Sequence, residues 1–250
     1  MEVKMSNTIS EGVEFFGDVQ MGENNHFAPG CKIFGPITIG SNNYFGSYCV
    51  IGLAGQDETL SLELHSATNQ GFGSTLDTIE IGNNNIFREF STVHRGINGK
   101  TSVADHVYVM TYANISHNSN IHAHVKLASN VQMGGYTTIF QNSYIGMSAV
   151  LHQFSIVGAF SMVGMGSIVT KDIRVGSKAY GSPCREVGAN MIALNRIGIS
   201  DDSWWSLENQ FRREEVPRNL ISHIKDYDSE TIRRDQLRES VKLIRKSLEK

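Results

Sequence analysis

The sequence is poor in several features that would define its class. It has 3 cysteines and 4 prolines in 250 residues, and no two cysteines form a CxxC pair. Free thiols are usual in a reducing compartment, so we expect a cytoplasmic protein. No hydrophobic run is long enough to cross a bilayer, and the first ten residues lack the apolar core of a signal peptide. The net charge of −3 gives no reason to expect a nucleic-acid or membrane partner.

Glycine, in contrast, is abundant at 24 residues, and apolar residues recur with a period of six. From residue 101 the third residue of every hexad is aliphatic or Met. The same period runs through the N-terminal part and returns after an interruption. The positions are Val3, Ile9, Phe15, Met21, Phe27, Ile33, Ile39, Phe45, Ile51, Ile81, Phe87, Val93, Val103, Val109, Ile115, Ile121, Leu127, Met133, Ile139, Ile145, Leu151, Val157, Val163, Val169 and Val175.

A period of six fits neither an amphipathic helix nor simple strand alternation. It predicts a triangular solenoid in which each hexad makes a short strand and a turn, and three hexads close one coil. The repeated apolar residue then points into a narrow prism, and neighbouring coils lie about 4.8 Å apart. Gly and Asn tolerate the positive φ angles of tight corners. Cys31 and Cys49 are three hexads apart, so we interpret them as stacked small core residues rather than a disulfide.

Two interruptions and a change of pattern divide the chain. Residues 54–78 carry no clean repeat, and the gap from Val93 to Val103 is ten residues, which predicts a second loop near 96–101. Both loops are candidate walls of a binding site or, alternatively, tolerated surface insertions. We therefore expect a β-solenoid over 1–184 and an α-helical domain over 185–250. Residues 212–250 hold 11 Lys and Arg against 8 acids, a face on which an acidic carrier protein could dock.

A coil of three hexads places His117, Gly135 and Gln153 in one column. Each stands two places after an apolar repeat position, where side chains point out of the prism. An imidazole can act as the general base for an attacking hydroxyl, and a backbone N–H can stabilise the oxyanion that develops. Glycine suits that position because a larger side chain would obstruct a thioester carbonyl. The column therefore favours acyl transfer over a purely structural prism.

Several segments resemble the UDP-N-acetylglucosamine acyltransferases of the hexapeptide-repeat acyltransferase family. "STVHRG", "ISHNS", "VLHQFSIVG", "SMVGMGS" and "GANMIALNRIGIS" occur in that family's order and at nearly its spacing. The resemblance implies a left-handed parallel β-helix that assembles as a homotrimer. It also implies transfer of a (3-hydroxy)acyl chain from acyl carrier protein to UDP-N-acetylglucosamine or a related sugar nucleotide, the first step of lipid A-type synthesis. The acyl chain would be carried on phosphopantetheine, without a metal or another cofactor.

The resemblance also implies residue roles. His117 would be the catalytic base, and Gly135 would supply the oxyanion amide. His152 and Gln153 would lie by the donor thioester and the acceptor sugar, and His94 on the acceptor side. Asn190 and Arg196 would bind phosphate or phosphopantetheine, Arg196 through charge-assisted hydrogen bonds.

Four positions depart from the family pattern. Asn118 replaces the Asp that usually holds the catalytic imidazole; an amide can fix the tautomer but cannot stabilise an imidazolium by charge. Asn114 and Tyr136 replace family histidines, so the acceptor sugar is left open and both Asn118 and Tyr136 remain candidate substrate contacts. Met165 replaces a Gly along the acyl groove, which predicts a shorter acyl chain, unless Met165 only fills a gap between subunits.

Two other enzyme classes remain open. His117 and His122 have the spacing of paired zinc ligands in the γ-class carbonic anhydrases, which share the prism, but a third histidine in register is missing. "YGSPCR" resembles a turn of the hexapeptide acetyltransferases that use acetyl-CoA. Those proteins generally end in a short tail, whereas a long segment with helical periodicity follows here, which favours a carrier-protein donor.

Overall fold

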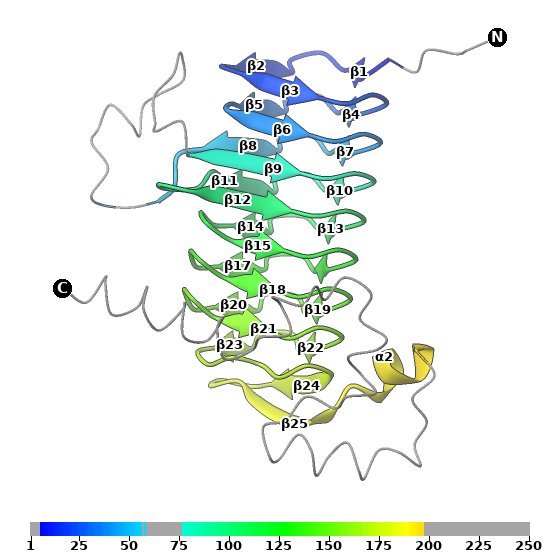
Figure 1. Ribbon diagram of the computed structural model, residues 1–250, viewed down its shortest axis with the longest axis vertical. Coiled ribbons are helices and arrows are strands. Elements are labelled where there is room, and N and C mark those ends of the chain that lie inside the picture. Colours follow the sequence, from blue (N-terminus) through cyan, green and yellow to red (C-terminus); the bar gives the residue numbers. More distant parts are fainter. Residues whose placement is uncertain (1–5, 57, 59–76, 198–250) are drawn as a thin grey trace.

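The computed structural model describes residues 6–56, 58 and 77–197, which form a triangular prism of three parallel β-sheets (Figure 1). The fold is the triangular solenoid predicted from the period of six and the left-handed parallel β-helix that the family resemblance implies. The A sheet contains β1 (Thr8–Ile9), β4 (His26–Phe27), β7 (Tyr44–Phe45), β10 (Ile86–Phe87), β13 (Tyr108–Val109), β16 (Lys126–Leu127), β19 (Tyr144–Ile145), β22 (Met162–Val163), β24 (Ser177–Tyr180) and β25 (Arg185–Ala189).

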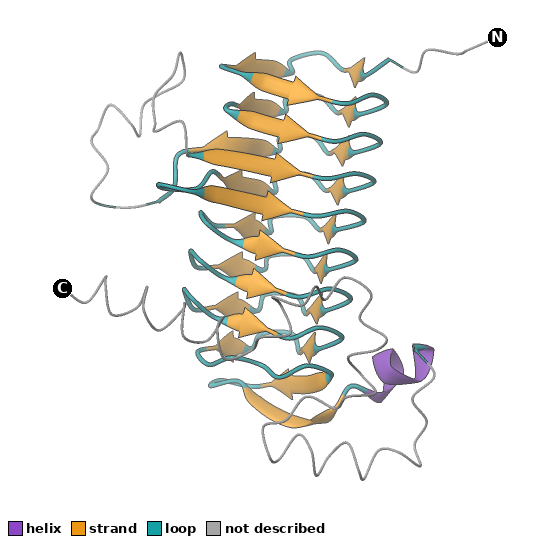
Figure 2. Cartoon of the chain, in the orientation of Figure 1, coloured by secondary structure: helices purple, strands orange, loops and turns teal. Residues whose placement is uncertain are grey.

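The other two faces have the same construction, and Figure 2 shows the short strands alternating with turns. The B sheet contains β2 (Glu14–Phe16), β5 (Lys32–Phe34), β8 (Val50–Leu53), β11 (Thr92–His94), β14 (Asn114–Ile115), β17 (Gln132–Met133), β20 (Val150–Leu151) and β23 (Ile168–Val169). The C sheet contains β3 (Val19–Met21), β6 (Ile37–Ile39), β9 (Thr78–Ile81), β12 (Lys100–Val103), β15 (Asn120–Ile121), β18 (Thr138–Ile139) and β21 (Ile156–Val157).

The repeated apolar residues fill the prism, as predicted. From Val103 to Val169 every one of them is at most 4% exposed. The expectation for Val175 was wrong: Val157 pairs with Ile173, and Val175 is buried outside the prism in the cluster that contains Leu194, because the last coil is shorter than three hexads. Ile121 pairs with Ile139, and Ile139 with Val157, so successive coils of the regular part are three hexads apart. Burial falls toward the N-terminal edge, where Ile9 is 55% exposed and Phe15 and Met21 are only partly buried, because the strands there have a neighbouring coil on one side only within the described residues. Val3 lies outside the described residues.

Large side chains in the N-terminal coils stack directly on their equivalents. The rings of Phe27, Phe45 and Phe87 are parallel, with centroids 4.8 and 5.1 Å apart. Such pairs contribute about 0.5–1.5 kcal/mol each beyond the area they bury.

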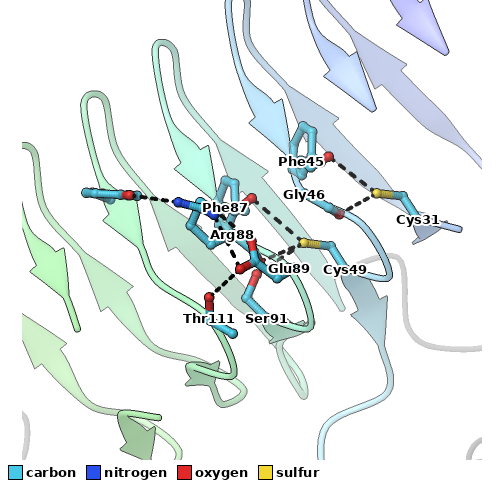
Figure 3. A network of polar contacts seen from close by, with 10 residues as sticks. Cys31, Phe45, Gly46, Cys49, Phe87, Arg88, Glu89, Ser91 and Thr111 are labelled. Atoms are coloured by element: carbon cyan, nitrogen blue, oxygen red, sulfur yellow. Dashed lines mark hydrogen bonds and ion pairs between the residues drawn. The ribbon is translucent and has the colours of Figure 1, made fainter. Parts of the chain in front are cut away.

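Cys31 and Cys49 are free and are buried beside these rings (Figure 3). The Cys31 thiol donates to the Gly46 carbonyl at 2.8 Å, and its hydrogen bond with Cys49, together with burial, raises its pKa.

The three corners of the prism are turns with a residue in the left-handed region. We name each corner by the two sheets it joins. The AB corner contains Tyr48, Phe90, Tyr112, Asn130 and Ser148; the BC corner contains Asn118, Tyr136 and Phe154; the CA corner contains Asn24, Asn42, Asn84, His106, His124, Asn142 and Phe160. Asn tolerates this conformation well, and bulky residues there are rare.

The predicted second loop is present at the BC corner. Residues 95–99 join β11 to β12, and they make this coil longer than the regular coils, since Asn114 pairs with Thr92 rather than with the residue three hexads before it. The extra length therefore stays outside the prism. Of the predicted loop 54–78, residues 57 and 59–76 lie outside the described residues.

The C-terminal end of the prism differs from the predicted boundary at 185. Arg185–Ala189 forms β25, which pairs antiparallel with β24, and an ion pair between Arg174 and Glu186 holds it to the last coil. The short helix α2 (Met191–Arg196) follows and packs its buried Leu194 near Phe160 and Val175 (Figure 1). Residues 198–250 of the predicted helical domain lie outside the described residues. Within the described part, no helix is long and apolar enough to span a membrane.

Candidate active site

His117 lies at the BC corner directly after β14, and its column is in register. The Tyr136 N–H donates to the His117 carbonyl at 2.9 Å, and the Phe154 N–H donates to the Gly135 carbonyl at 3.0 Å. His117, Gly135 and Gln153 therefore occupy equivalent positions on three successive coils, as the count of three hexads per coil predicts. His117 is 9% exposed, whereas Gln153 is exposed.

Gly135 makes room for the His117 ring. A Cβ added to Gly135 would lie 2.6 Å from both Cε1 and Nε2 of the imidazole, closer than any real Cβ contact. Only glycine allows the ring to lie across this turn. Within the described residues, neither the Gly135 N–H nor the Nε2 atom of His117 has a hydrogen-bond partner. A proton acceptor and a hydrogen-bond donor are therefore left unused beside each other.

Asn118 holds the other side of the ring. Its Oδ1 atom lies 2.9 Å from Nδ1 of His117 and also accepts the Ile97 N–H at 2.9 Å. Its Nδ2 group donates to the Ile97 carbonyl at 3.3 Å, and its own N–H donates to Oγ1 of Thr101 at 2.8 Å. In Figure 1 the turn that carries Ile97 lies beside the turn that follows β14. The four-residue excess of loop 95–99 thus reaches the side chain next to His117.

His94 lies one coil earlier on the same side of the prism. It ends β11, is 8% exposed, and its Nδ1 atom lies 2.9 Å from the Ala54 carbonyl. Burial lowers its pKa below the usual 6.5, and the nearby His117 lowers it further. Asn114, at a position where the family has histidine, hydrogen-bonds to His94 and accepts a 2.8 Å hydrogen bond from Thr92. Burial and His117 therefore both favour the neutral form of His94.

Aromatic rings line the column on the far side of the base. The Tyr136 ring meets the His117 ring edge-on, with centroids 5.3 Å apart, and stacks on Phe154 at 4.9 Å. Edge contacts of this kind fix the orientation of a ring. His152, one coil further, is exposed, and its Nδ1 atom lies 2.9 Å from the Gln153 carbonyl. His94, Asn118, Tyr136, His152 and Gln153 thus gather along the BC corner with His117.

Three predicted site residues lie elsewhere in the chain. Asn190 is buried at the start of α2, and its Nδ2 group donates to the Phe160 carbonyl at the CA corner. Arg196 lies exposed in the last turn of α2. Met165 is 77% exposed on the AB corner. A single copy of the chain does not bring these three residues to His117.

The arrangement of the remaining histidines bears on the zinc alternative. His122 lies near the CA corner, where its ring stacks on Phe140 at 4.5 Å, while His117 belongs to the BC corner. No group of three or more His, Cys, Asp or Glu side chains in the described part of the chain could hold a metal ion.

Several residues around His117 were not predicted from the sequence. Ile97 acts through its backbone, which no residue type reveals. Gly55 has a steric role: an added Cβ would lie 2.6 Å from Ile97 and 2.9 Å from the Cβ of His117. Arg95 is only 6% exposed and donates to the Gly35 carbonyl at 3.2 Å, and burial lowers its pKa. Arg95 could have been noticed in the sequence because it directly follows His94 in the motif "STVHRG".

Comparisons with known proteins support the same family resemblance as the sequence motifs. No family model matches the chain. It is 36% identical over 135 residues to proteins named acyl-[acyl-carrier-protein]–UDP-N-acetylglucosamine O-acyltransferase from Burkholderia mallei and Burkholderia lata. The predicted resemblance is confirmed. The match covers 53% of this chain and 52% of the relatives, so the chain spans about half the length of the curated relatives it matches.

Three solved structures share the fold. The LpxA structure from Acinetobacter baumannii is 25% identical, with a TM-score of 0.63 and 89% of each chain covered. The UDP-N-acetylglucosamine acyltransferase from Bacteroides fragilis is 24% identical, with a TM-score of 0.64 over 98% of this chain and 94% of that one. The enzyme from Campylobacter jejuni has a TM-score of 0.66 at 21% identity, covering 88% and 92%.

Proposed function

We propose that this protein is an O-acyltransferase that moves a (3-hydroxy)acyl chain from acyl carrier protein to UDP-N-acetylglucosamine or a related sugar nucleotide. The observation that carries the proposal is the pairing of an unused imidazole nitrogen with an unused glycine N–H at the BC corner, within the described residues. The curated relatives carry this activity in their names, which supports the same donor and acceptor.

His117 acts as the general base in the proposed reaction. Its Nε2 atom takes the proton of a sugar hydroxyl as the oxygen attacks the thioester carbonyl carbon. The carbon–oxygen bond forms, and the negative charge that develops on the carbonyl oxygen is stabilised by the Gly135 N–H. The carbon–sulfur bond then breaks, and the imidazolium returns its proton to the leaving thiolate. General-base catalysis of this kind contributes about 10²–10⁴-fold in rate, and each oxyanion donor a comparable factor.

A homotrimer would complete the site. Exposed apolar residues gather on the A sheet (Tyr44, Ile86, Tyr144), the AB corner (Tyr48, Phe90, Tyr112, Met147, Met165) and the end of the B sheet (Val150, Ile168). The outward positions of the C sheet from β3 to β18 are polar instead: Gln20, Thr38, Glu80, Ser102, Asn120 and Thr138. Large exposed apolar surfaces mark interfaces, so we place the AB corner toward a threefold axis.

This assembly brings the separated residues together. With the AB corner at the axis, the BC corner of one copy faces the CA corner of the next across a cleft. Asn190 and Arg196, which lie by the CA corner, would then approach the partner's BC corner. The acyl chain would run inward between the A and B sheets toward Met165. Arg196 would bind a phosphate group of the donor or acceptor.

The first experiment is a product search. The full chain is incubated with a series of 3-hydroxyacyl carrier proteins and UDP-N-acetylglucosamine, and products are identified by mass spectrometry. We expect an acylated sugar nucleotide that disappears in His117→Ala. Product from acetyl-CoA but from no carrier protein would overturn the donor. Product only with another sugar nucleotide would identify that nucleotide as the acceptor, and its chemistry would show what Tyr136 and Asn118 admit.

A second experiment tests the assembly. Sedimentation should give a mass three times the 27.7 kDa of one chain. Tyr112→Glu would place a charge on the exposed aromatic column and should dissociate the trimer and abolish transfer together. Thr38→Glu on the C sheet is the matched control, since the proposal leaves that face in solvent. A monomeric wild-type chain that still transfers acyl groups would contradict the shared site.

A further inference from the structure

The side chain of Asn118 faces a choice that an aspartate would not have. A carboxylate presents only oxygen to the neighbouring imidazole, whereas an amide can present either its oxygen or its NH2 group. If the NH2 group faced Nδ1 of His117, that nitrogen would have to be the acceptor and Nε2 would carry the ring proton. Nε2 could then not accept a proton from a substrate, and the base would be disabled.

Loop 95–99 removes the choice. The Ile97 N–H requires an acceptor and lies 2.9 Å from Oδ1, while the Ile97 carbonyl requires a donor and lies 3.3 Å from Nδ2. Both contacts would be lost, and like groups would face each other, if the amide turned over. Gly99 leaves space for the Nδ2 group, since a Cβ there would lie 3.1 Å from it. The backbone N–H and C=O groups of one residue, Ile97, therefore set the orientation of the amide.

We propose that the backbone N–H and C=O groups of Ile97 and the side chain of Asn118 together act as a tautomer lock on His117, so that Nδ1 carries the ring proton and Nε2 accepts. With Oδ1 turned toward Nδ1 at 2.9 Å, the only hydrogen bond available is from an Nδ1–H group to the amide oxygen. Asn118 is thus a positioning residue, and the catalytic significance of the lock rests on the proposed function. The lock replaces the orienting part of a carboxylate's role without adding a negative charge.

The lock explains two features together. The four extra residues of loop 95–99 supply the backbone N–H and C=O groups of Ile97 that orient the amide. The backbone of Asn118 is fixed independently, by the hydrogen bond from its N–H to Thr101 and by its positive φ of 57°. Since both the backbone and the amide are held, the Oδ1 atom has one position relative to the imidazole.

The direct test uses no substrate. Histidine labelled with 15N in both ring nitrogens is incorporated into the full chain, and the His117 signals are assigned by their loss in His117→Gln. At a pH where the ring is neutral, we expect the proton on Nδ1. In Asn118→Ala we expect a mixture of tautomers, and the same in Ile97→Pro, which removes the N–H that orients the amide and also replaces the Ile97 side chain. A resting ring with its proton on Nε2, or an unchanged Nδ1–H tautomer in Asn118→Ala, would overturn the lock.

Kinetics then separate positioning from structure. Asn118→Ala should lower kcat at least about tenfold, because fewer His117 rings would have an Nε2 atom that can accept a proton. KM should change less than about twofold, because the substrate-binding surface remains. Asn118→Asp should restore kcat and move the acidic limb of the pH–rate profile to higher pH, since a carboxylate favours the protonated ring. Asn24→Ala is the matched control: Asn24 has φ of 60° at the N-terminal end of the CA corner and bonds to Asn42 rather than to the candidate site.

The lock and the proposed reaction fail in different ways. An Nδ1–H ring that loses its preference in Asn118→Ala supports the lock even if no acyl product is found, and then only the proposed function is overturned. Equal kcat values for wild type and Asn118→Ala in an active enzyme would overturn the lock while the reaction stands.

Discussion

The BC and CA corners of the prism are built from the same kind of turn but use their polar groups differently. At the CA corner, side chains bond to the next coil: the Ser41 N–H donates to Asn83 Oδ1 at 2.8 Å, and the Asn83 N–H donates to Asp105 Oδ1 at 2.6 Å. At the BC corner, Asn118 bonds outward to loop 95–99 and sideways to His117.

This difference in polar contacts favours the BC corner as the place of the proposed acyl transfer. The CA-corner side chains that bond from coil to coil contribute stability, because an unmade hydrogen bond is costly where water is excluded, although the buried Nδ2 of Asn85 and Nε2 of Gln141 at this corner have no hydrogen-bond partner within the described residues. The BC corner leaves Nε2 of His117 and the N–H of Gly135 without partners in the described part of the chain. Four experiments can break or sharpen this contrast, from the largest expected effect to the smallest.

Replacing a histidine at each corner gives the largest contrast. His117→Asn should lower kcat about 10³-fold, because it removes the proposed base, with little change in thermal unfolding. His124→Asn at the CA corner should leave kcat unchanged, since His124 is exposed and Asn suits its φ of 60°. Steady-state kinetics would measure both variants, and an equal loss of activity in the two would contradict the contrast between the BC and CA corners.

Adding one carbon atom to Gly135 should displace the base. Gly135→Ala would place a Cβ 2.6 Å from the His117 ring, and we expect kcat to fall about 100-fold as the ring moves from its position. Gly17→Asn at the N-terminal end of the BC corner is the control, because an added Cβ there comes no closer than 3.5 Å to another atom and Asn tolerates a φ of 73°. Retained activity in Gly135→Ala would mean that the ring can act from another position.

Met165 tests whether the AB corner contributes to specificity. Met165→Gly should shift the preferred acyl chain toward longer donors, changing the ratio of kcat/KM values for neighbouring lengths about tenfold, as expected for a methylene or two in an apolar groove. Competition between carrier proteins of different acyl length would measure the ratio. An unchanged length preference, with a weakened trimer, would identify Met165 as interface packing only.

His94 gives the smallest effect, in stability rather than rate. Its pKa is lowered by burial and by His117, so the folded state binds fewer protons than the unfolded chain. Its contribution to stability is present above the unfolded value of 6.5 and is lost as pH falls through the lower folded value. Thermal unfolding at pH 7.5 and 5.5 should therefore show a smaller acid-induced drop in Tm for His94→Gln than for wild type. An identical drop in both proteins would show that other groups control it.

Most of the fold could be predicted from the sequence, because the period of six reflects one repeated steric environment. Every apolar repeat position from Val103 to Val169 faces the core, and the break before Val103 is a loop, whereas Val175 is buried outside the prism. The column of His117 and Gly135 followed from the same count. Ile9 and the strand at Arg185–Ala189 did not, since both lie at the ends of the prism, where neighbouring coils no longer impose the pattern.

The surroundings of the candidate base were less predictable. Asn118 could be recognised as a departure from the family pattern. Its partners, however, are the backbone N–H and C=O groups of Ile97, and the residue type at position 97 does not reveal such contacts. Asn190, Arg196 and Met165 have positions that no count within one chain connects to His117. Their relation depends on the contact between copies, which depends on surface shape rather than on period.

The insertion that carries Ile97 leaves the pairing of the coils on either side unchanged: Val93 still pairs with Ile115, and Val103 with Ile121. The length and composition of loop 95–99 can therefore vary over evolutionary time without altering the scaffold. Single changes in an outer segment could retune the proton affinity and timing of the neighbouring imidazole while the inner coils stay the same. Solenoids of this type can in this way diversify their chemistry one turn at a time.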